Sequence, residues 1–278
     1  MRNSIRKSLS SKYHRFVKRG ISGITASSRV LPDFIIGGTV RSGSTSLYYN
    51  ICEHPSVLEA SYDEIGFFDS NYQLGMEWYR SMFPKQKEMD EVRNSTGFAI
   101  TGEDTPFYFW KKEVIERILK NLPNIKIILI FRNPVDRAYS NYNLGVRTNT
   151  EKLTFEKAIE EEIKFLDNHT FRETVDRRRS YLTKGMYDEQ IKFWFEEFPK
   201  NQVHILSTEE MQNHPQDTLM EVFQFLGISQ YTIKNPQKQK LANYEKMNDE
   251  TRKKLLEFYK LHNKNFFNII QKRFDWEI

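Results

Sequence analysis

The 278-residue chain contains one cysteine, Cys52, so it cannot close a disulfide bond within itself. Its six histidines are scattered, and none is spaced from Cys52 or from carboxylates in the way that metal ligands usually are. Internal repeats and low-complexity tracts are also absent. A disulfide-stabilised scaffold and a metal site are therefore not predicted, and the single cysteine fits a reducing compartment.

Acidic residues are missing from the first 32 positions, which hold eight of the lysines and arginines. This segment carries +8, and residues 33–278 carry −3. No apolar run in it approaches 18 residues, so we predict no transmembrane anchor there. A basic arm of this kind is a candidate for contact with a membrane surface or a polyanion. We therefore expect a cytoplasmic or peripheral membrane location.

Nucleic acid is not an expected partner, because the basic excess is confined to the arm and no recognition module is present. Residues 33–278 are long enough for one α/β domain with a full core. We expect strands at 33–38, 124–131 and 203–206, and helices at 155–166, 185–198 and 214–226, the last ending at Gly227. This alternation predicts a P-loop-like, three-layer α/β fold with a central, mainly parallel sheet flanked by helices.

A glycine-rich turn lies between the first apolar segment and the following helix, in the sequence DFIIGGTVRSGSTSL of residues 33–47. Gly38, Gly43 and Thr45 fall on the spacing of a P-loop, but Ser44 stands where the lysine for the β- and γ-phosphates would be. Arg41 is the basic residue of this loop. Backbone N–H groups at a helix start still bind phosphate, so we predict a nucleotide without a γ-phosphate.

The apolar segment NIKIILIF, residues 124–131, ends in Arg132 and not in the aspartate expected to hold Mg²⁺ beside the phosphates. A guanidinium there favours a second phosphate, gripped by Arg132 together with Ser140. Pro134 suits the first position of the intervening helix, and we expect Arg137 to be a surface or structural residue of it. Two phosphate sites, without an aspartate to bind Mg²⁺, are what a nucleotide with phosphates at its 3′ and 5′ positions would need.

On these residues the sequence resembles the sulfotransferases that use 3′-phosphoadenylyl sulfate (PAPS). Their 5′-phosphosulfate loop is matched by Arg41-Ser42-Gly43-Ser44-Thr45, and their 3′-phosphate motif R-x-P-x-x-R-x-x-S by residues 132–140. The resemblance covers about residues 32–278 and is closer to the carbohydrate branch that includes the heparan sulfate sulfotransferases. Segments 63–69, 75–79, 105–109, 265–267 and 274–276 carry that likeness.

The resemblance implies transfer of a sulfuryl group from PAPS to an acceptor hydroxyl, expected on a sugar, without a metal. It implies that Glu64 is the general base and that Arg41 stabilises the departing bisphosphate. Nucleotide-binding residues implied in this way are Arg41, Ser42, Gly43, Ser44, Thr45, Ser46, Arg132, Ser140, Lys238 and Lys240, with solvated surface lysines as the alternative for the last two.

The sequence departs from the heparan branch in three places, two of which concern the acceptor side. Gly66 stands where a histidine usually follows the glutamate, and Asp104 stands in the place of a lysine. The disulfide-closed loop of those enzymes is absent as well. Two alternatives stay open: a degenerate P-loop kinase, and a non-catalytic nucleotide- or polysaccharide-binding protein. Whichever acceptor is used, these changes argue against a strongly anionic one.

Overall fold

The computed structural model describes residues 26–177, 179–234, 236 and 244–277. The predicted nucleotide ligands Lys238 and Lys240 lie outside the described residues, as does most of the basic arm. The last part of that arm packs on the domain. Ala26 is fully buried, Arg29 forms an antiparallel bridge with Lys85, and the Val30 amide donates to the Pro84 carbonyl at 3.1 Å.

A five-stranded parallel sheet forms the centre, with the strand order β2-β3-β1-β4-β5. The strands are β1 (Phe34–Gly38), β2 (Val57–Leu58), β3 (Ile100–Asp104), β4 (Lys126–Phe131) and β5 (Val203–Ser207). β1 is therefore central, with β3 on one side and β4 on the other. Its carboxyl end lies between theirs, at the edge where open parallel sheets bind ligands. The predicted three-layer fold with a parallel sheet is confirmed.

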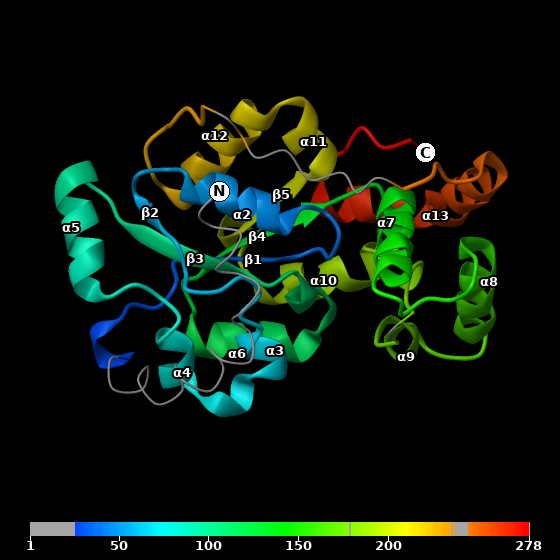
Figure 1. Ribbon diagram of the computed structural model, residues 1–278, viewed down its shortest axis with the longest axis horizontal. Helices are drawn as coiled ribbons and strands as arrows, with labels where there is room; N and C mark the ends of the chain where they lie inside the picture. Colours follow the sequence, from blue (N-terminus) through cyan, green and yellow to red (C-terminus); the bar gives the residue numbers. More distant parts are fainter. Residues whose placement is uncertain (1–25, 178, 235, 237–243, 278) are drawn as a thin grey trace.

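Side chains alternate between the two faces of the sheet, as strand geometry requires. Phe34 and Ile36 of β1 join one apolar cluster with α2 (Ser44–Cys52), α11 (Thr208–Asn213) and α12 (Pro215–Leu226). Ile35 points to the other face and joins the larger cluster. Figure 1 shows α2, α11 and α12 above the sheet and α3, α4, α6 and α10 below it.

Further elements complete the two outer layers. On the larger cluster lie α3 (Phe67–Ser70), α4 (Met76–Arg80), η3 (Pro106–Trp110), α6 (Lys112–Asn121) and α10 (Asp188–Glu197), and α5 (Gln86–Thr96) lies beyond β2 and β3. A third cluster joins α7 (Pro134–Arg147), α8 (Phe155–Leu166) and α13 (Asp249–Ile270). Short connecting turns are η1 (Ala26–Ser28), η2 (Tyr72–Leu74), α9 (Phe171–Val175), η4 (Thr183–Gly185) and η5 (Lys200–Gln202).

The expected elements agree closely with the observed ones. The helix predicted over 155–166 is α8, and α10 begins three residues later than predicted because residues 183–185 form the separate turn η4. Gly227 ends α12 with φ 78°, a left-handed conformation in which a side chain would be strained. Among the described residues, no helix combines the length and apolarity needed to cross a membrane.

Candidate active site

The loop after β1 is fixed by hydroxyl groups. The Thr39 amide donates to the Ile130 carbonyl at 2.7 Å, and the Thr39 and Ser42 hydroxyl oxygens are 2.6 Å apart. From the other side, the Thr208 hydroxyl contacts the Ser42 carbonyl at 2.6 Å and the Phe131 carbonyl at 3.0 Å. Because β4 and the first residue of α11 both contribute contacts, the loop is held at the edge of the sheet.

Gly43 ends the loop and caps α2 with φ 90°, a left-handed conformation that favours glycine. It has no side chain to accept from the first amides of α2, so these donors stay available to an anion. Ser44 is buried at this helix start, and Thr45 and Ser46 are half-buried. The residues predicted to hold the 5′-phosphosulfate are therefore gathered at one helix N-terminus.

Gly38 has a packing role that the P-loop spacing does not predict. It is the last residue of β1, and a Cβ atom there would lie 2.7 Å from the Cβ of Phe109. The glycine is thus required where η3 packs against the end of the strand.

The two predicted phosphate sites adjoin. The Arg41 guanidinium donates from Nε and Nη2 to the Ser140 hydroxyl at 3.1 and 3.0 Å, and Arg132 Nη1 lies 3.4 Å from the Arg41 carbonyl oxygen. Asn133 caps α7 by accepting from the Val135 amide at 3.0 Å, which directs Ser140 back toward the loop. The structure therefore brings Arg41, Arg132 and Ser140 together.

Positive charge accumulates around Arg41. Burial lowers the pKa of its guanidinium, and repulsion from Arg132, Arg147 and Arg137 lowers it further. Arg147 was not among the predicted site residues. It lies seven positions after Ser140, and a spacing of two helical turns places both on one face of α7, so helical periodicity could have identified it. A dianionic phosphate would relieve this repulsion.

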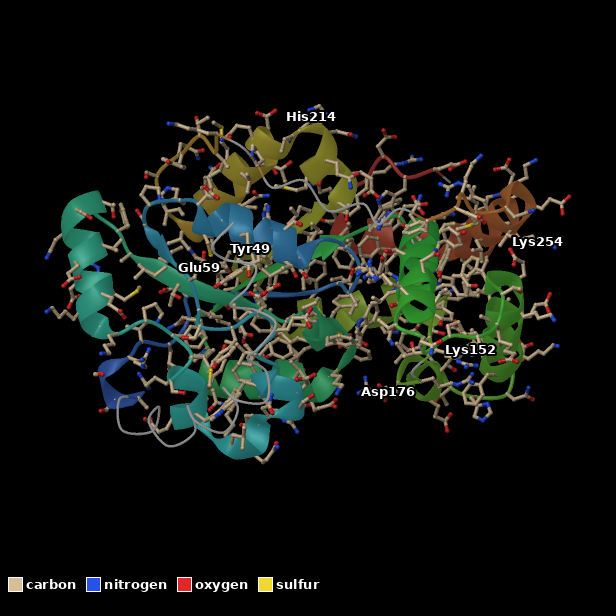
Figure 2. All side chains as sticks on the ribbon, viewed as in Figure 1. Tyr49, Glu59, Lys152, Asp176, His214 and Lys254 are labelled. Carbon is tan, nitrogen blue, oxygen red and sulfur yellow. The ribbon has the colours of Figure 1, made fainter. Side chains whose placement is uncertain are left out.

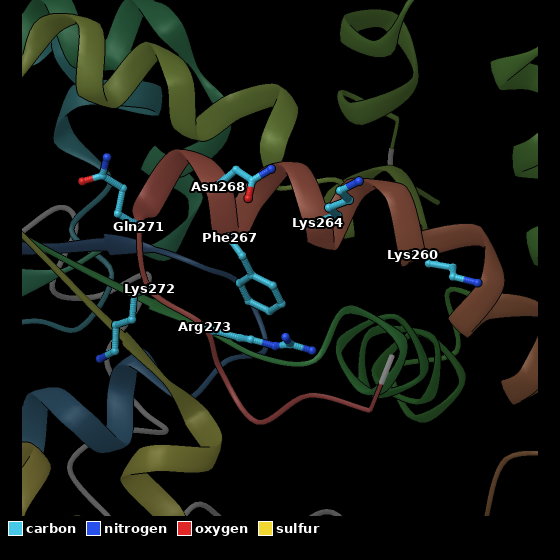
Figure 3. A pocket seen from close by; sticks show the side chains of 7 residues that line it. All are labelled: Lys260, Lys264, Phe267, Asn268, Gln271, Lys272 and Arg273. Carbon is cyan, nitrogen blue, oxygen red and sulfur yellow. The ribbon is translucent and has the colours of Figure 1, made fainter.

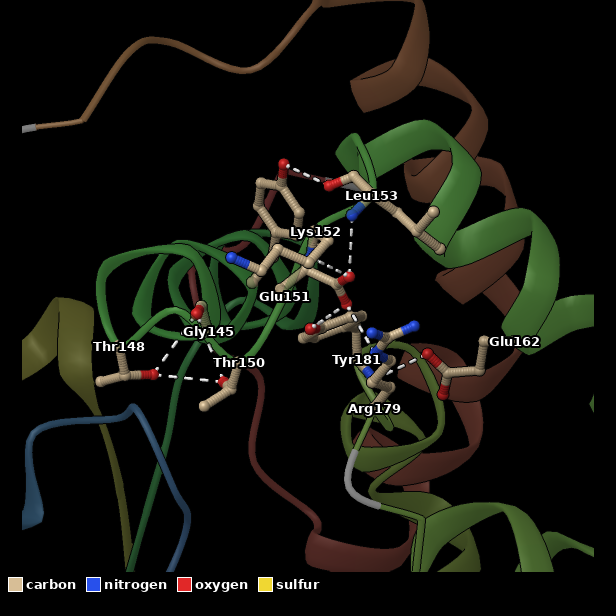
Figure 4. Close-up of polar contacts among 10 residues, drawn as sticks. Gly145, Thr148, Thr150, Glu151, Lys152, Leu153, Glu162, Arg179 and Tyr181 are labelled. Atoms are coloured by element: carbon tan, nitrogen blue, oxygen red, sulfur yellow. Dashed lines mark hydrogen bonds and ion pairs between the residues drawn. The ribbon is translucent and has the colours of Figure 1, made fainter.

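A polar network anchors the end of α7 that carries Arg147 (Figure 4). Glu151 accepts from the amides of Lys152 and Leu153 at 2.7 and 2.9 Å and from the Tyr181 hydroxyl at 2.8 Å, and Arg179 lies 3.3 Å away. Burial by itself would raise the pKa of Glu151, but these donors outweigh it and the pKa is lowered. The anchored carboxylate fixes the loop after α7.

Arg137 is a structural residue of the interior and not of the surface. Its side chain is fully buried, and Nη2 donates to the Tyr181 carbonyl. Its Nε and Nη1 atoms have no hydrogen-bond partner among the described residues. The surface part of the prediction for Arg137 is therefore wrong, because α7 packs this face against the segment before η4.

Glu64 lies in a segment tied to the end of β3. The Glu64 amide donates to the Asp104 carbonyl at 3.0 Å, and the Gly66 amide donates to the Thr105 hydroxyl at 3.2 Å. Asn71 holds the carbonyls of residues 65 and 66 at 3.0 and 3.1 Å. Burial and repulsion from Asp63 raise the pKa of Glu64, while Arg41 opposes the shift.

Carboxylates end the strand beside β1. Glu103 is fully buried, and it accepts from the hydroxyls of Tyr79 and Thr105, both at 2.6 Å. Its pKa is about 7, because burial raises it more than these donors lower it. Asp104 follows, level with Ile36 of β1. The sequence analysis noted that the segment 124–131 is followed by Arg132 where a metal-binding aspartate would be expected; β3, the neighbour of β1 on the other side, ends in Glu103 and Asp104.

One group of three potential metal ligands converges in the described part of the chain: Asp188, Glu189 and His262. His262 Nδ1 lies 2.8 Å from Asp188 Oδ1, and Asn265 donates to the same carboxylate at 3.2 Å. Sequence spacing did not reveal this grouping, because α10 and α13 are far apart in the chain. None of its members is a predicted site residue.

A groove of about 510 Å³ lies along the end of α13 (Figure 3). It is lined by Lys260, Lys264, Phe267, Asn268, Gln271, Lys272 and Arg273. Lys272 is paired with Glu210 at 2.9 Å. The groove contains none of the predicted site residues.

Residues 31–276 match the family described as "Sulfotransferase domain". The chain belongs to the sulfotransferase family. This match includes both phosphate motifs and Glu64, and it rules out the kinase alternative. The sulfotransferase domain thus accounts for nearly all of the described structure.

Relatives of this sulfotransferase include "Membrane-associated sulfotransferase kil1" of Dictyostelium discoideum, 24% identical over 89% of this chain and 67% of the relative. "Heparan sulfate glucosamine 3-O-sulfotransferase 5" of Mus musculus is 33% identical over 73% of this chain. The chain spans little more than half of that relative, 56% of its length. The sulfotransferase from Alicyclobacillus acidocaldarius has the same fold, with a TM-score of 0.68 at 24% identity over 88% of this chain and 98% of that one.

Proposed function

We propose that this sulfotransferase moves the sulfuryl group of PAPS to the hydroxyl of a carbohydrate acceptor. The observation that carries the proposal is the contact of Arg41 with Ser140 beside the open N-terminus of α2. One cationic side chain then borders both the phosphosulfate loop and the 3′-phosphate motif. The heparan sulfate relative supports a sugar as the acceptor.

In the proposed reaction the acceptor oxygen attacks sulfur, and the bond from sulfur to the bridging oxygen of PAPS breaks. The acceptor proton passes to Glu64, and the electron pair of the broken bond stays on adenosine 3′,5′-bisphosphate. Arg41 neutralises the negative charge that develops there, a role in which one well-placed donor contributes about 3 kcal/mol. The raised pKa of Glu64 makes it a stronger base than an ordinary carboxylate.

The proposed position of PAPS follows from the contact of Arg41 with Ser140 and from the N-terminus of α2. Amides of Gly43, Ser44 and Thr45 would hold the 5′-phosphosulfate, and Arg132 and Ser140 the 3′-phosphate. The chemistry resembles phosphoryl transfer in that positioning and charge stabilisation account for most of the acceleration. No metal is required by this scheme.

Thermal unfolding with nucleotides tests the proposal. A ligand at about 100 times its Kd stabilises a fold by roughly 2.7 kcal/mol, which is visible as a rise in Tm. We expect adenosine 3′,5′-bisphosphate to stabilise the protein and ATP with Mg²⁺ to leave it unchanged. Binding of the bisphosphate without consumption of PAPS in the presence of sugars would favour the non-catalytic alternative, and stabilisation by neither nucleotide would refute the donor site.

A further inference from the structure

The two residues assigned to the chemistry share an unusual backbone conformation. Arg41 has φ 69° and Glu64 has φ 49°, so both lie in the left-handed region that side chains rarely adopt. In the described part of the chain, the other non-glycine residues with positive φ are Asn149 and Gln271. A strained conformation of this kind persists only where the surrounding contacts determine it. The contacts of the Glu64 segment therefore decide where the base lies.

Two buried hydroxyl groups hold the segment that runs from residue 64 to residue 68. The Gly66 amide donates to the Thr105 hydroxyl at 3.2 Å, and the Phe68 amide donates to the Tyr108 hydroxyl at 3.1 Å. Thr105 is 2% exposed and Tyr108 is fully buried, so both hydroxyls are shielded from water. The backbone of the segment is thus bound to side chains at the start of η3.

Glu103 fixes the direction of both hydroxyls. Its carboxyl group accepts from Thr105 at 2.6 Å and from Tyr108 at 3.3 Å, and the Tyr79 hydroxyl adds a third bond of 2.6 Å. A hydroxyl that donates to a carboxylate keeps its lone pairs for other donors, and here the two amides use them. Because each hydroxyl oxygen has two lone pairs, the amides keep their acceptors even when Glu103, whose pKa burial raises to about 7, takes up a proton.

Thr105 also connects the segment to the Arg41 side of the site. Its amide donates to the Ile36 carbonyl of β1 at 3.0 Å, and β1 leads into the loop that carries Arg41. At the start of the segment, the Tyr49 hydroxyl donates to Asp63 Oδ1 at 2.6 Å, and Tyr49 is labelled in Figure 2 on α2. Contacts from β1 and α2 therefore set the place of the base relative to this loop.

We propose that Thr105 and Tyr108 are positioning residues for sulfuryl transfer, whose hydroxyls hold the Glu64 segment in its strained conformation and thereby orient the base toward the acceptor hydroxyl. Since both side chains are buried, they act through the segment and not on the substrate. The proposal rests on the proposed role of Glu64 as general base. A small displacement of a catalytic group slows a reaction strongly, so loss of one amide acceptor should lower kcat more than it weakens substrate binding.

Thr105→Val removes the hydroxyl but keeps the shape of the side chain, and Thr105→Ser keeps the hydroxyl. Release of labelled sulfate from PAPS in the presence of dextran, a neutral polysaccharide, counts transfer to sugar and to water alike. We expect kcat to fall about tenfold or more in Thr105→Val and to stay within about threefold of the wild type in Thr105→Ser. KM for PAPS and the Kd of adenosine 3′,5′-bisphosphate should change little in both variants.

Tyr108→Phe removes the second acceptor and should lower kcat in the same way, so it tests the proposal independently if Thr105→Val does not fold. Tyr79→Phe is the matched control. It removes a hydroxyl from the same carboxyl group, but this hydroxyl binds neither amide, and the ring keeps its contacts with Phe67 and Phe68. We expect lower stability in Tyr79→Phe, with kcat per bisphosphate-binding site close to that of the wild type.

Hydrogen exchange gives a readout that does not depend on turnover. With the bisphosphate bound, Thr105→Val should increase amide exchange over residues 64–70 and leave α8 unchanged, and Thr105→Ser should exchange like the wild type. Wild-type kcat in Thr105→Val, an equal fall of kcat in Tyr79→Phe, no rescue by Thr105→Ser, or unchanged exchange would each overturn the proposal.

Failure of the proposed function has a different signature. Wild-type turnover in Glu64→Gln, or no consumption of PAPS by the wild type, would remove the base and the positioning proposal together. A slow Glu64→Gln variant combined with wild-type kcat in Thr105→Val would remove the positioning role alone. Retained binding of the bisphosphate in every variant would show that the donor site is intact in these comparisons.

Discussion

The guanidinium of Arg41 donates two hydrogen bonds, of 3.1 and 3.0 Å, to the hydroxyl of Ser140. These residues come from the loop after β1 and from the second turn of α7, and each belongs to a different phosphate motif. Their contact means that the predicted 5′ and 3′ phosphate sites share a cation. A ligand with phosphates at both positions should therefore be preferred over a nucleotide with only one.

Replacement of the 3′-phosphate residues should remove this preference. Arg132→Ala should weaken binding of adenosine 3′,5′-bisphosphate by about 1.5–3 kcal/mol, the range for a hydrogen bond to a charged group, and Ser140→Ala by about 0.5–1.5 kcal/mol. Affinity for adenosine 5′-phosphate, which lacks the second phosphate, should change little. Titration calorimetry with both nucleotides measures the difference.

The matched control is Arg93→Ala on α5, where the arginine is exposed and pairs with Asp90 at 2.8 Å. It should bind both nucleotides like the wild type. Equal losses for the two nucleotides in Arg132→Ala would show that this residue acts on general affinity and would contradict the 3′-phosphate assignment.

Glu64→Gln keeps the shape of the side chain and removes the base. We expect kcat to fall by about 10² or more, because general base catalysis contributes 10²–10⁴, while the Kd of the bisphosphate stays within about twofold. Single-turnover transfer of labelled sulfate measures the chemical step. Glu53→Gln, an exposed carboxylate at the end of α2, should be fully active, and wild-type turnover in Glu64→Gln would exclude Glu64 as the base.

The decrease of activity at low pH should reflect the ionisation of Glu64. Glu64 must be ionised to accept a proton, and its pKa is raised, so activity should be full above this raised value and fall as the pH decreases through it. The midpoint should lie above about 4.3, the ordinary value for glutamate. Asp63→Asn removes the repulsion that adds to the shift, so it should move the midpoint to lower pH. If the wild type and Asp63→Asn have the same midpoint, a group other than Glu64 controls the loss of activity at low pH.

Much of the donor side could be predicted from the sequence, because its residues follow strands that periodicity identifies. The apolar segment 124–131 is typical of a buried strand, which the structure has over Lys126–Phe131, and Asn133-Pro134 marks the helix start after it. Arg132 and Ser140 are therefore placed by local rules. The contact of Arg41 with Ser140 was not predicted, because it depends on the angle at which α7 leaves the sheet.

The acceptor side was harder to predict, because strand order decides it. Periodicity does not reveal that β3 lies beside β1, so Asp104 could be recognised as a departure from the family but not as the buried neighbour of Glu64. The sequence of β3 contains Thr101, Glu103 and Asp104, so it lacks the apolar pattern by which a buried strand is predicted. Arg137 was misplaced for a different reason: its burial results from packing of α7 against the segment before η4, which local sequence does not reveal.

Gly38→Ala tests the packing role of the glycine that the P-loop spacing assigns to phosphate binding. The new methyl group would lie 2.7 Å from Cβ of Phe109, whose ring is fully buried and whose carbonyl accepts from the Trp194 indole at 3.1 Å. Since Phe109 has no room to retreat, we expect a loss of about 1–3 kcal/mol in the free energy of unfolding, measured with denaturant. Gly37→Ala is the control, because its methyl group would come no closer than 3.3 Å, to the end of the Trp194 ring, and should cost less. Equal stability of the two variants would show that η3 adjusts to the added methyl group, and that the glycine is needed elsewhere in the loop.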